Sequence, residues 1–245
     1  MMYISSINND IVREKVKLKV KKYRDITNTY LIEGEHLVSE AINSGVIECV
    51  FILKDYSYDI PSNIVKYEVS YEILKRLSDN VSTPKIIGVC KKQESDKIGN
   101  RVLLLDRLQD PGNLGTIIRS AVAFNFDTII LSEESVDLYN SKVIRSTQGM
   151  MFKINIIRRN ITNVIDKLKK DNYLILGTDV INGVEVSSVN IKDKYALVIG
   201  NEGQGISDEV KDLCDKMLYI NMNSNCESLN ASVAASILMY ELGGK

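Results

Sequence analysis

The sequence predicts an α/β protein whose larger part is a mostly parallel sheet flanked by helices. Short, almost continuously apolar runs recur through the second half of the 245-residue chain, and patterns of helical period separate them. Strands that are apolar on both faces, alternating with helices, are typical of a parallel sheet covered on both sides. The predicted strands are Val102–Leu105, Thr128–Leu131, Tyr173–Leu176 and Ala196–Ile199, and the predicted helices are Leu114–Phe124, Ile161–Lys170 and Asp208–Cys214.

A smaller α/β region precedes this sheet. Its predicted strands are Thr29–Ile32, Val46–Leu53 and Ile86–Cys90; its predicted helices are Glu35–Asn43 and Tyr71–Leu77, and Ser78–Pro84 has turn composition. The polar segment Lys91–Asn100 is interpreted as a linker. We therefore expect one domain over residues 1–95 and a second over residues 101–245.

The composition narrows the class of protein. The chain is 44% hydrophobic and 26% charged, as in soluble globular proteins, and it contains no apolar run of membrane-spanning length and no signal peptide. Its four cysteines are scattered without CxxC spacing. We therefore expect a cytoplasmic protein with reduced thiols, no membrane partner and no metal site.

One segment is strongly basic although the net charge of the chain is only −1. Val16, Val20 and Tyr23 have the spacing of one helical face, which predicts an amphipathic helix with a basic outer surface. Two interpretations stay open: a surface that follows RNA phosphates, with steep salt dependence of binding, or a solvated helix face. The basic residues are Arg13, Lys15, Lys17, Lys19, Lys21, Lys22 and Arg24.

The first of three unusual loops follows the strand at Val102–Leu105. Pro111-Gly112 predicts a turn, Asn113 is expected at or near the start of the next helix, and Arg119 lies just inside that helix. In a parallel sheet, ligands bind beyond the carboxyl ends of the strands. The sequence therefore favours a site that includes Asn113 and Arg119.

The other two loops have glycines or small residues. Gly200, Gly203 and Gly205 follow the strand Ala196–Ile199 and allow close approach of a ligand to the backbone. The polar loop Asn221–Glu227 leads through Ser228, Leu229 and Asn230 into an alanine-rich helix, whose first N–H groups are expected to be free for a ligand.

Each signal has a plainer interpretation when taken alone. The glycine order differs from GxGxxG, so a dinucleotide-binding reductase is poorly supported. His36 is interpreted as a structural residue on a helix, and Cys226 has no histidine nearby in the sequence to activate it.

Together, however, the three loops resemble the three signature motifs of the SpoU (TrmH-type) RNA 2′-O-ribose methyltransferases of the SPOUT class. The motifs are DPGNLGTIIRSA with Asn113 and Arg119, IGNEGQGIS with Asn201-Glu202-Gly203, and Ile220 through Glu227-Ser228-Leu229-Asn230-Ala231. The similarity covers residues 101–243. The segment EGEHLVSEA resembles the L30e-like domain that often precedes this catalytic domain. Asn221 stands where the family commonly has proline.

The resemblance implies a trefoil knot, a homodimer and S-adenosylmethionine as cofactor. It implies RNA ribose 2′-O-methylation, with ribosomal RNA favoured over transfer RNA, and substrate binding by the L30e-like domain. The implied catalytic residues are Asn113, Arg119, Glu202, Ser228 and Asn230, and the implied cofactor-binding residues are Thr178, Gly200, Asn201, Gly203, Ile220 and Leu229. Arg145 is expected to join the basic segment in binding RNA.

The roles of individual groups remain hypotheses at this stage. A guanidinium stays protonated, so we expect Arg119 to hold a phosphate and stabilise developing negative charge rather than act as a base. Glu202 is expected either to accept a proton or to organise its loop by hydrogen bonds. Alternative functions are a transfer-RNA ribose methyltransferase, a base-methylating relative, or an RNA-binding protein that retains the pocket without turnover.

Overall fold

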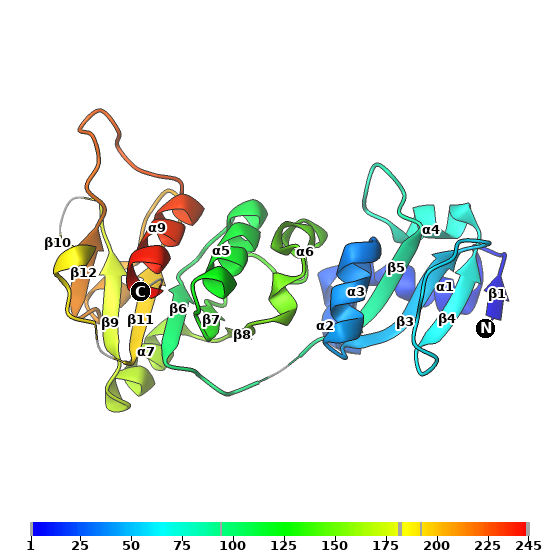
Figure 1. Ribbon diagram of the computed structural model, residues 1–245, viewed down its shortest axis with the longest axis horizontal. Coiled ribbons are helices and arrows are strands. Elements are labelled where there is room, and N and C mark those ends of the chain that lie inside the picture. Colours follow the sequence, from blue (N-terminus) through cyan, green and yellow to red (C-terminus); the bar gives the residue numbers. More distant parts are fainter. Residues whose placement is uncertain (1, 94, 181–182, 192, 244–245) are drawn as a thin grey trace. The chain divides into compact units, whose positions relative to one another are not determined.

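The computed structural model describes residues 2–93, 95–180, 183–191 and 193–243 (Figure 1). Its contacts define two compact units. Unit 1 combines Met1–Glu94 with Asp137–Phe152, and unit 2 combines Ser95–Val136 with Lys153–Lys245. Within the predicted linker, Glu94 lies outside the described residues.

Unit 2 is built on a seven-stranded sheet with the order β10-β12-β9-β11-β6-β7-β8. Every strand pairing in it that the structure describes is parallel, as the sequence predicts. The strands are β6 (Arg101–Leu105), β7 (Thr128–Leu131), β8 (Asn155–Arg158), β9 (Leu174–Thr178), β10 (Val184–Glu185), β11 (Tyr195–Ile199) and β12 (Lys216–Tyr219).

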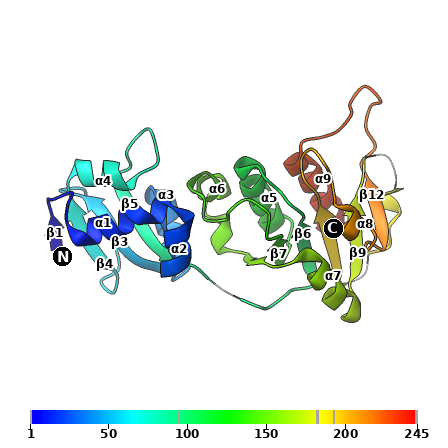
Figure 2. The same ribbon diagram turned by 180° about the vertical axis from the view of Figure 1, so that it is seen from behind.

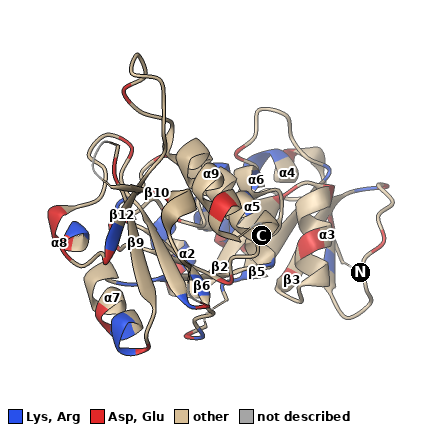
Figure 3. Ribbon diagram, turned by 60° about the vertical axis from the view of Figure 1, so that its left-hand side comes forward, with Lys and Arg blue, Asp and Glu red and all other residues tan. Residues whose placement is uncertain are grey.

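Helices cover both faces of this sheet (Figures 1 and 2). On one face, α7 (Ile161–Lys170) and α8 (Asp208–Lys211) bury side chains such as Ile165 and Val210 against the strands. On the other, α5 (Pro111–Ala123) packs beside α9 (Ala231–Gly243), and the hydroxyls of Ser120 and Ser236 lie 2.7 Å apart. Lysines gather in the last turn of α7, where they complement the negative end of the helix dipole (Figure 3).

Unit 1 contains a mixed five-stranded sheet with the order β1-β4-β3-β5-β2. Strand β5 is antiparallel to both of its neighbours, and the other pairings are parallel. Its strands are β1 (Met2–Ile4), β2 (Thr29–Glu33), β3 (Ile47–Leu53), β4 (Val65–Val69) and β5 (Ile86–Lys91), and its helices include α3 (Glu35–Asn43) and α4 (Tyr71–Leu77). Strands β1 and β4 were not predicted, because β1 is only three residues long and the sequence of β4, VKYEV, is half-polar.

The last part of unit 1 comes from the middle of the chain. Asp137–Phe152 includes α6 (Ser141–Thr147) and the 3₁₀ turn η2 (Met150–Phe152), and it packs on the N-terminal elements. The rings of Tyr139 and Tyr30 lie 4.5 Å apart, and His36 contacts the carbonyl oxygen of Gln148 at 3.1 Å. The interpretation of the exposed His36 as a structural residue stays a prediction that this contact supports.

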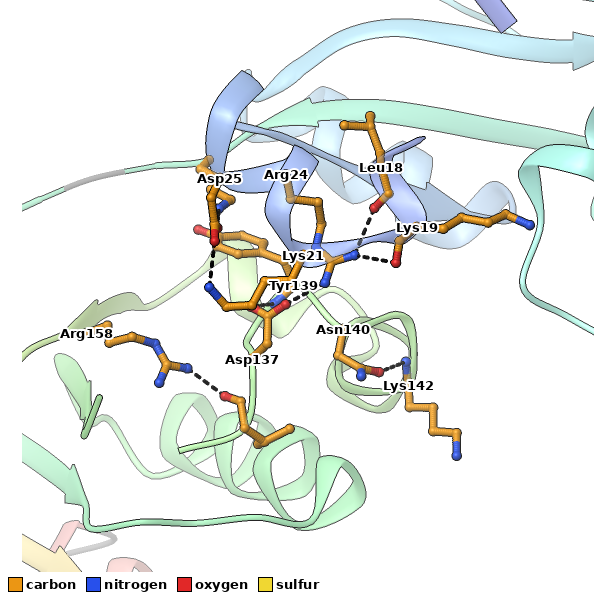
Figure 4. A network of polar contacts seen from close by, with 12 residues as sticks. Leu18, Lys19, Lys21, Arg24, Asp25, Asp137, Tyr139, Asn140, Lys142 and Arg158 are labelled. Atoms are coloured by element: carbon orange, nitrogen blue, oxygen red, sulfur yellow. Dashed lines mark hydrogen bonds and ion pairs between the residues drawn. The ribbon is translucent and has the colours of Figure 1, made fainter. Parts of the chain in front are cut away.

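The prediction of one amphipathic basic helix is wrong. The segment forms α1 (Asp10–Val16), the 3₁₀ turn η1 (Lys17–Lys19) and α2 (Lys21–Thr27), with Val20 extended and 54% exposed. The buried guanidinium of Arg24 donates to the carbonyl oxygens of Leu18 and Lys19, which a continuous helix would use internally (Figure 4). The chain therefore breaks before α2.

Most of the basic side chains in this segment are already paired with acids. Arg24 forms a 2.6 Å ion pair with Asp137, so its expected contact with RNA is replaced by a structural role. Four further pairs are Arg13–Asp10, Lys15–Glu48, Lys19–Asp79 and Lys21–Asp25. Arg145 donates to the side-chain oxygen of Asn80 at 2.6 Å. Within the described residues, no helix is long and apolar enough to cross a membrane.

Candidate active site

A cavity of about 330 Å³ opens in unit 2 beyond the carboxyl ends of β9, β11 and β12. Its wall is formed largely by backbone, glycine and apolar side chains, among them Leu218, Met222 and Leu238. The sequence-predicted residues that line it are Thr178, Gly200, Asn201, Glu202, Gly203, Ile220, Ser228 and Leu229. The fold thus brings together all six expected cofactor-binding residues and two of the five expected catalytic residues.

The motif-two loop (Gly200–Ser207) is a tightly bonded turn. The backbones of Asn201 and Gly205 exchange two hydrogen bonds of 2.9 Å, and the side-chain oxygen of Asn201 accepts the N–H groups of Gly203 and Gln204. A Cβ atom at Gly200 would lie only 2.1 Å from the carbonyl carbon of Gly205, which itself has a φ of +70°. Only glycine fits at Gly200, because its neighbours there are backbone atoms.

The motif-one loop (Asp106–Asn113) leads into α5, but Asn113 is not its N-cap. Asp110 is the N-cap, Pro111 occupies the first helical position, and the Asp110 carboxylate accepts the Asn113 N–H at 2.7 Å. The prediction placed the helix start at Asn113 and so missed the capping residue. Asn113 lies in the first turn and is buried.

Glu202 connects the motif-one and motif-two loops. Its carboxylate accepts the N–H groups of Gln109 at 3.2 Å and Asp110 at 2.9 Å, and the side-chain amide of Asn113 at 3.1 Å. Burial raises the pKa of Glu202, but these hydrogen bonds outweigh burial and hold the pKa below its usual value. Glu202 is therefore ionised at neutral pH and committed to organising the two loops.

Asn230 links this network to the motif-three loop (Asn221–Asn230). Its side-chain amide donates to the Asn113 oxygen at 2.9 Å, while its own oxygen accepts the N–H groups of Ser232 and Val233. The expectation of free N–H groups in the first turn of α9 is therefore wrong at these two positions, because Asn230 caps the helix. The amides of Asn113 and Asn230 and the carboxylate of Glu202 form one continuous chain of hydrogen bonds.

Arg119 lies apart from this network. It is exposed on α5 and is not among the residues that line the cavity of its own chain. Next to α5, Val233, Ile237 and Tyr240 of α9 are 46%, 38% and 56% exposed and follow helical spacing. The face formed by α5 and α9 therefore combines an exposed guanidinium with an apolar stripe.

Several residues of the site escaped sequence reasoning. Asp106 is buried and accepts the N–H of Ser207 at 2.8 Å, which ties the start of the motif-one loop to the end of the motif-two loop. Lys211 and Asp179 form a 2.8 Å ion pair at the cavity wall. The Asp-Pro pair at Asp110 was a readable capping signal, whereas Asp106 and Asp179 gave none. Among the described residues, no cluster of histidine, cysteine or acidic side chains has the arrangement of a metal site.

Comparison with known proteins identifies the family of this chain. Residues 100–240 match the family model of the SpoU rRNA methylases. The chain belongs to the SpoU rRNA methylase family. Residues 9–88 of this SpoU-family chain also match a model for the MRM3-like substrate-binding domain, so both sequence resemblances find a counterpart.

Individual relatives extend this similarity over the whole chain. The chain is 38% identical over 248 residues to the 23S rRNA (guanosine(2553)-2′-O)-methyltransferase RlmP of Bacillus subtilis, with full coverage of both. An AdoMet-bound rRNA methyltransferase from Sinorhizobium meliloti is 26% identical, with a TM-score of 0.87 and coverage of 98% of this chain and 96% of that one. The SpoU methyltransferase AviRb from Streptomyces viridochromogenes shares the fold, with a TM-score of 0.88 at 24% identity, covering 97% of this chain and 98% of its own.

Proposed function

We propose that this SpoU-family chain is an S-adenosylmethionine-dependent methyltransferase that modifies a ribose 2′-oxygen of ribosomal RNA. The observation that carries the proposal is the cavity of unit 2, bordered by the hydrogen-bonded chain of Asn113, Glu202 and Asn230. RlmP, 38% identical, is by its name a 2′-O-methyltransferase of guanosine 2553 in 23S rRNA. Its identity over the full chain favours ribosomal RNA over transfer RNA as substrate.

The cavity residues fit S-adenosylmethionine. Ile220 and Leu229 offer apolar surface for an adenine ring, and the glycine-rich wall of the motif-two loop leaves backbone N–H and C=O groups to read its edge. Thr178, Gly200, Asn201 and Gly203 would complete the binding wall. When bound, the cofactor supplies a methyl group on a positively charged sulfur, so the residues of the chain need only align and deprotonate the sugar.

The contacts of Glu202 support one of the two roles expected for it. Three donors already occupy its carboxylate and its pKa is lowered, which makes it a poor acceptor for the ribose proton. We assign it the organising role. Asn113 and Asn230 would position the loops at the ribose, and Ser228, at the cavity wall, would contact the substrate.

Arg119 is proposed to act in the cavity of a second copy of the chain. It is absent from the lining of its own cavity and is exposed on α5, the helix that packs beside α9 with its stripe of Val233, Ile237 and Tyr240. A homodimer through this face would bury the stripe and could deliver the guanidinium to the partner's substrate. There it would hold the phosphate beside the target ribose and stabilise developing negative charge.

The remaining features of the proposal follow from family membership. We propose a trefoil knot around the motif-two and motif-three loops, a cytoplasmic location, and domains over residues 1–95 and 101–245. RNA would contact unit 1 through its exposed basic side chains. Of the expected set, Arg13, Lys17, Lys21 and Lys22 are exposed, whereas Lys15, Lys19 and Arg145 are partly buried in polar contacts.

The test is methyl transfer from labelled S-adenosylmethionine to unmodified 23S rRNA, with the modified nucleotide mapped as a 2′-O-methyl group. We expect Arg119→Ala to lose activity and Arg119→Lys to recover little of it, because lysine lacks the planar fork. Mixing Arg119→Ala with a cavity variant, Leu229→Glu, should restore activity, since one heterodimer site would pair an intact cavity with an intact arginine. No restoration would contradict the shared site.

A wild-type chain that binds S-adenosylmethionine but transfers no methyl group would favour the alternative of a non-catalytic RNA-binding protein. Methylation of transfer RNA in preference to 23S rRNA would favour the second alternative. A product methylated on a base would contradict the ribose assignment.

A further inference from the structure

Arg158, at the end of β8, makes an unusual set of contacts in unit 2. Its Nη1 donates to the carbonyl oxygens of Ser132, Glu133 and Ser135 at 2.7–2.9 Å, and its Nη2 donates to that of Val136 at 2.6 Å. Figure 4 shows the guanidinium directed toward this stretch of chain. One side chain thus holds most of the loop Ser132–Val136, which follows β7.

The loop Ser132–Val136 in turn holds the motif-one loop. The hydroxyl of Ser132 accepts the N–H of Arg107 at 2.9 Å, and the hydroxyl of Ser135 accepts the N–H of Leu108 at 3.1 Å. The N–H of Val136 donates to the Leu108 carbonyl oxygen at 2.8 Å. The side-chain amide of Gln109 also donates to the carbonyl oxygen of Glu134 at 2.9 Å. Three consecutive residues of the motif-one loop are therefore anchored to a segment that Arg158 organises.

The anchored residues have a backbone that needs such support. Arg107 has a φ of +57°, in the left-handed region that residues with a side chain adopt at a cost. Its carbonyl oxygen accepts the side-chain amide of Asn201 at 2.9 Å, so this turn also fixes the motif-two loop. Directly after it, the N–H groups of Gln109 and Asp110 donate to Glu202.

We propose that Arg158 is a positioning residue for methyl transfer: by holding Ser132–Val136 it fixes the turn at Arg107–Gln109 and, through Glu202, the placement of Asn113. The proposal rests on the proposed methyltransferase function. The cavity that would hold S-adenosylmethionine is lined by neither Ser132–Val136 nor Arg107–Gln109. Loss of Arg158 should therefore slow the chemical step far more than it weakens the affinity for S-adenosylmethionine, because the turn reaches the cavity wall only through Asn201 and Glu202.

The chain offers a matched control in the next residue. Arg159 is exposed; its guanidinium pairs with the exposed carboxylate of Asp96 and donates to the carbonyl oxygen of Arg158. An exposed pair of this kind contributes little to stability. Arg159→Ala removes the same charge from the same strand end, so it separates the electrostatic effect of the guanidinium from its hydrogen bonds.

The experiment measures kcat for methylation of unmodified 23S rRNA and the Kd of S-adenosylmethionine by calorimetry for wild type, Arg158→Ala, Arg158→Lys and Arg159→Ala. We expect Arg158→Ala to lose ~10²-fold in kcat with a much smaller change in Kd, as for small misplacements of catalytic groups. Arg158→Lys should lie between, because an ammonium cannot reach four carbonyl oxygens, and Arg159→Ala should match wild type. Wild-type kcat in Arg158→Ala would overturn the proposal, as would an equal loss in Arg159→Ala.

A second variant covers the case in which Arg158→Ala fails to fold. Ser135→Ala removes the hydroxyl that anchors Leu108 without touching the guanidinium. We expect it to lower kcat with a much smaller change in Kd, and to add less than its full factor when combined with Arg158→Lys, because both act on the same turn. Wild-type kcat in Ser135→Ala, or losses that multiply fully, would overturn the proposal. An inactive wild-type chain would instead contradict the proposed function.

Discussion

The motif-one and motif-two loops differ sharply from the motif-three loop, although all three meet at the same end of one sheet. The first two are bound to each other through Glu202, through the Asn201 side chain and through Asp106. The motif-three loop is exposed over Asn223–Ser228, and its described links to the other loops run through Asn230 at its end.

This difference indicates that the three loops have different roles in the site. A network of hydrogen-bonded loops holds the reacting groups in place before substrate arrives. A loop with few buried contacts is free to open and close at low cost. We infer that the motif-one and motif-two loops fix geometry and that the motif-three loop admits the cofactor.

The largest expected effect comes from breaking the motif-two turn itself. In Gly200→Ala the new Cβ would meet backbone atoms of Gly205 and Ile206 at 2.1–2.2 Å, which no side-chain movement can relieve. We expect a loss of more than about 3 kcal/mol in the free energy of unfolding, measured by denaturant titration. Gly203→Ala is the control, because its Cβ would meet only the Asn201 side chain at 3.8 Å. Equal stability of the two variants would contradict a rigid turn.

A smaller loss of stability is expected from replacing the hydrogen bond that joins Asn113 of the motif-one loop to Glu202 of the motif-two loop. Asn113→Asp places a second carboxylate where an amide now donates to Glu202 at 3.1 Å. We expect a cost of about 1–2 kcal/mol at pH 7, because the exposed Glu202 carboxylate loses a donor and gains a like charge that water partly screens. Asn113→Ala should cost less, since it removes the donor without adding a charge.

The pH dependence of stability distinguishes these variants. Because the pKa of Glu202 is lowered in the folded state, its ionised carboxylate stabilises the fold above the unfolded-state pKa of about 4.3. This contribution to the free energy of unfolding is lost as pH falls through the folded-state pKa. Wild type should therefore change little from pH 7 to about pH 5. Asn113→Asp should become more stable over that interval, because the carboxylate pair takes up a proton. If the stability of Asn113→Asp changes as little as that of wild type over that interval, the two carboxylates do not interact.

Much of the fold and of the site could be predicted from the sequence, for identifiable reasons. Continuous apolar runs located β6, β7, β9 and β11, because strands buried on both faces carry an unmistakable pattern. The motif residues located the cavity, because their order along the chain resembles one family.

Other features depend on tertiary contacts that a local pattern cannot reveal. The basic segment has helical spacing, but Arg24 forms an ion pair with Asp137, which lies more than a hundred residues away in the sequence. In this position its guanidinium also binds the carbonyl oxygen of Leu18, and the helix is interrupted. The half-polar strand β8 ends at Arg158, whose four carbonyl partners lie over twenty residues earlier. Asp110 was overlooked because Asn113, a residue equally suited to capping, stands three positions later.

The smallest expected effect concerns the open loop, where Cys226 serves as a probe. Cys226 is exposed, whereas burial raises the pKa of Cys49 to about 12 and that of Cys214 to about 11 and raises the pKa of Cys90 further. At pH 8 iodoacetamide should therefore label Cys226 first, with the other three thiols as internal controls.

Met222, Ser228 and Leu229, on either side of Cys226, line the cavity, so a bound cofactor should order this loop. With S-adenosylmethionine at ten times its Kd, labelling should slow about tenfold if only the free form reacts. An unchanged rate at saturating cofactor would mean that the motif-three loop does not close, and the contrast with the two fixed loops would then lie in exposure alone.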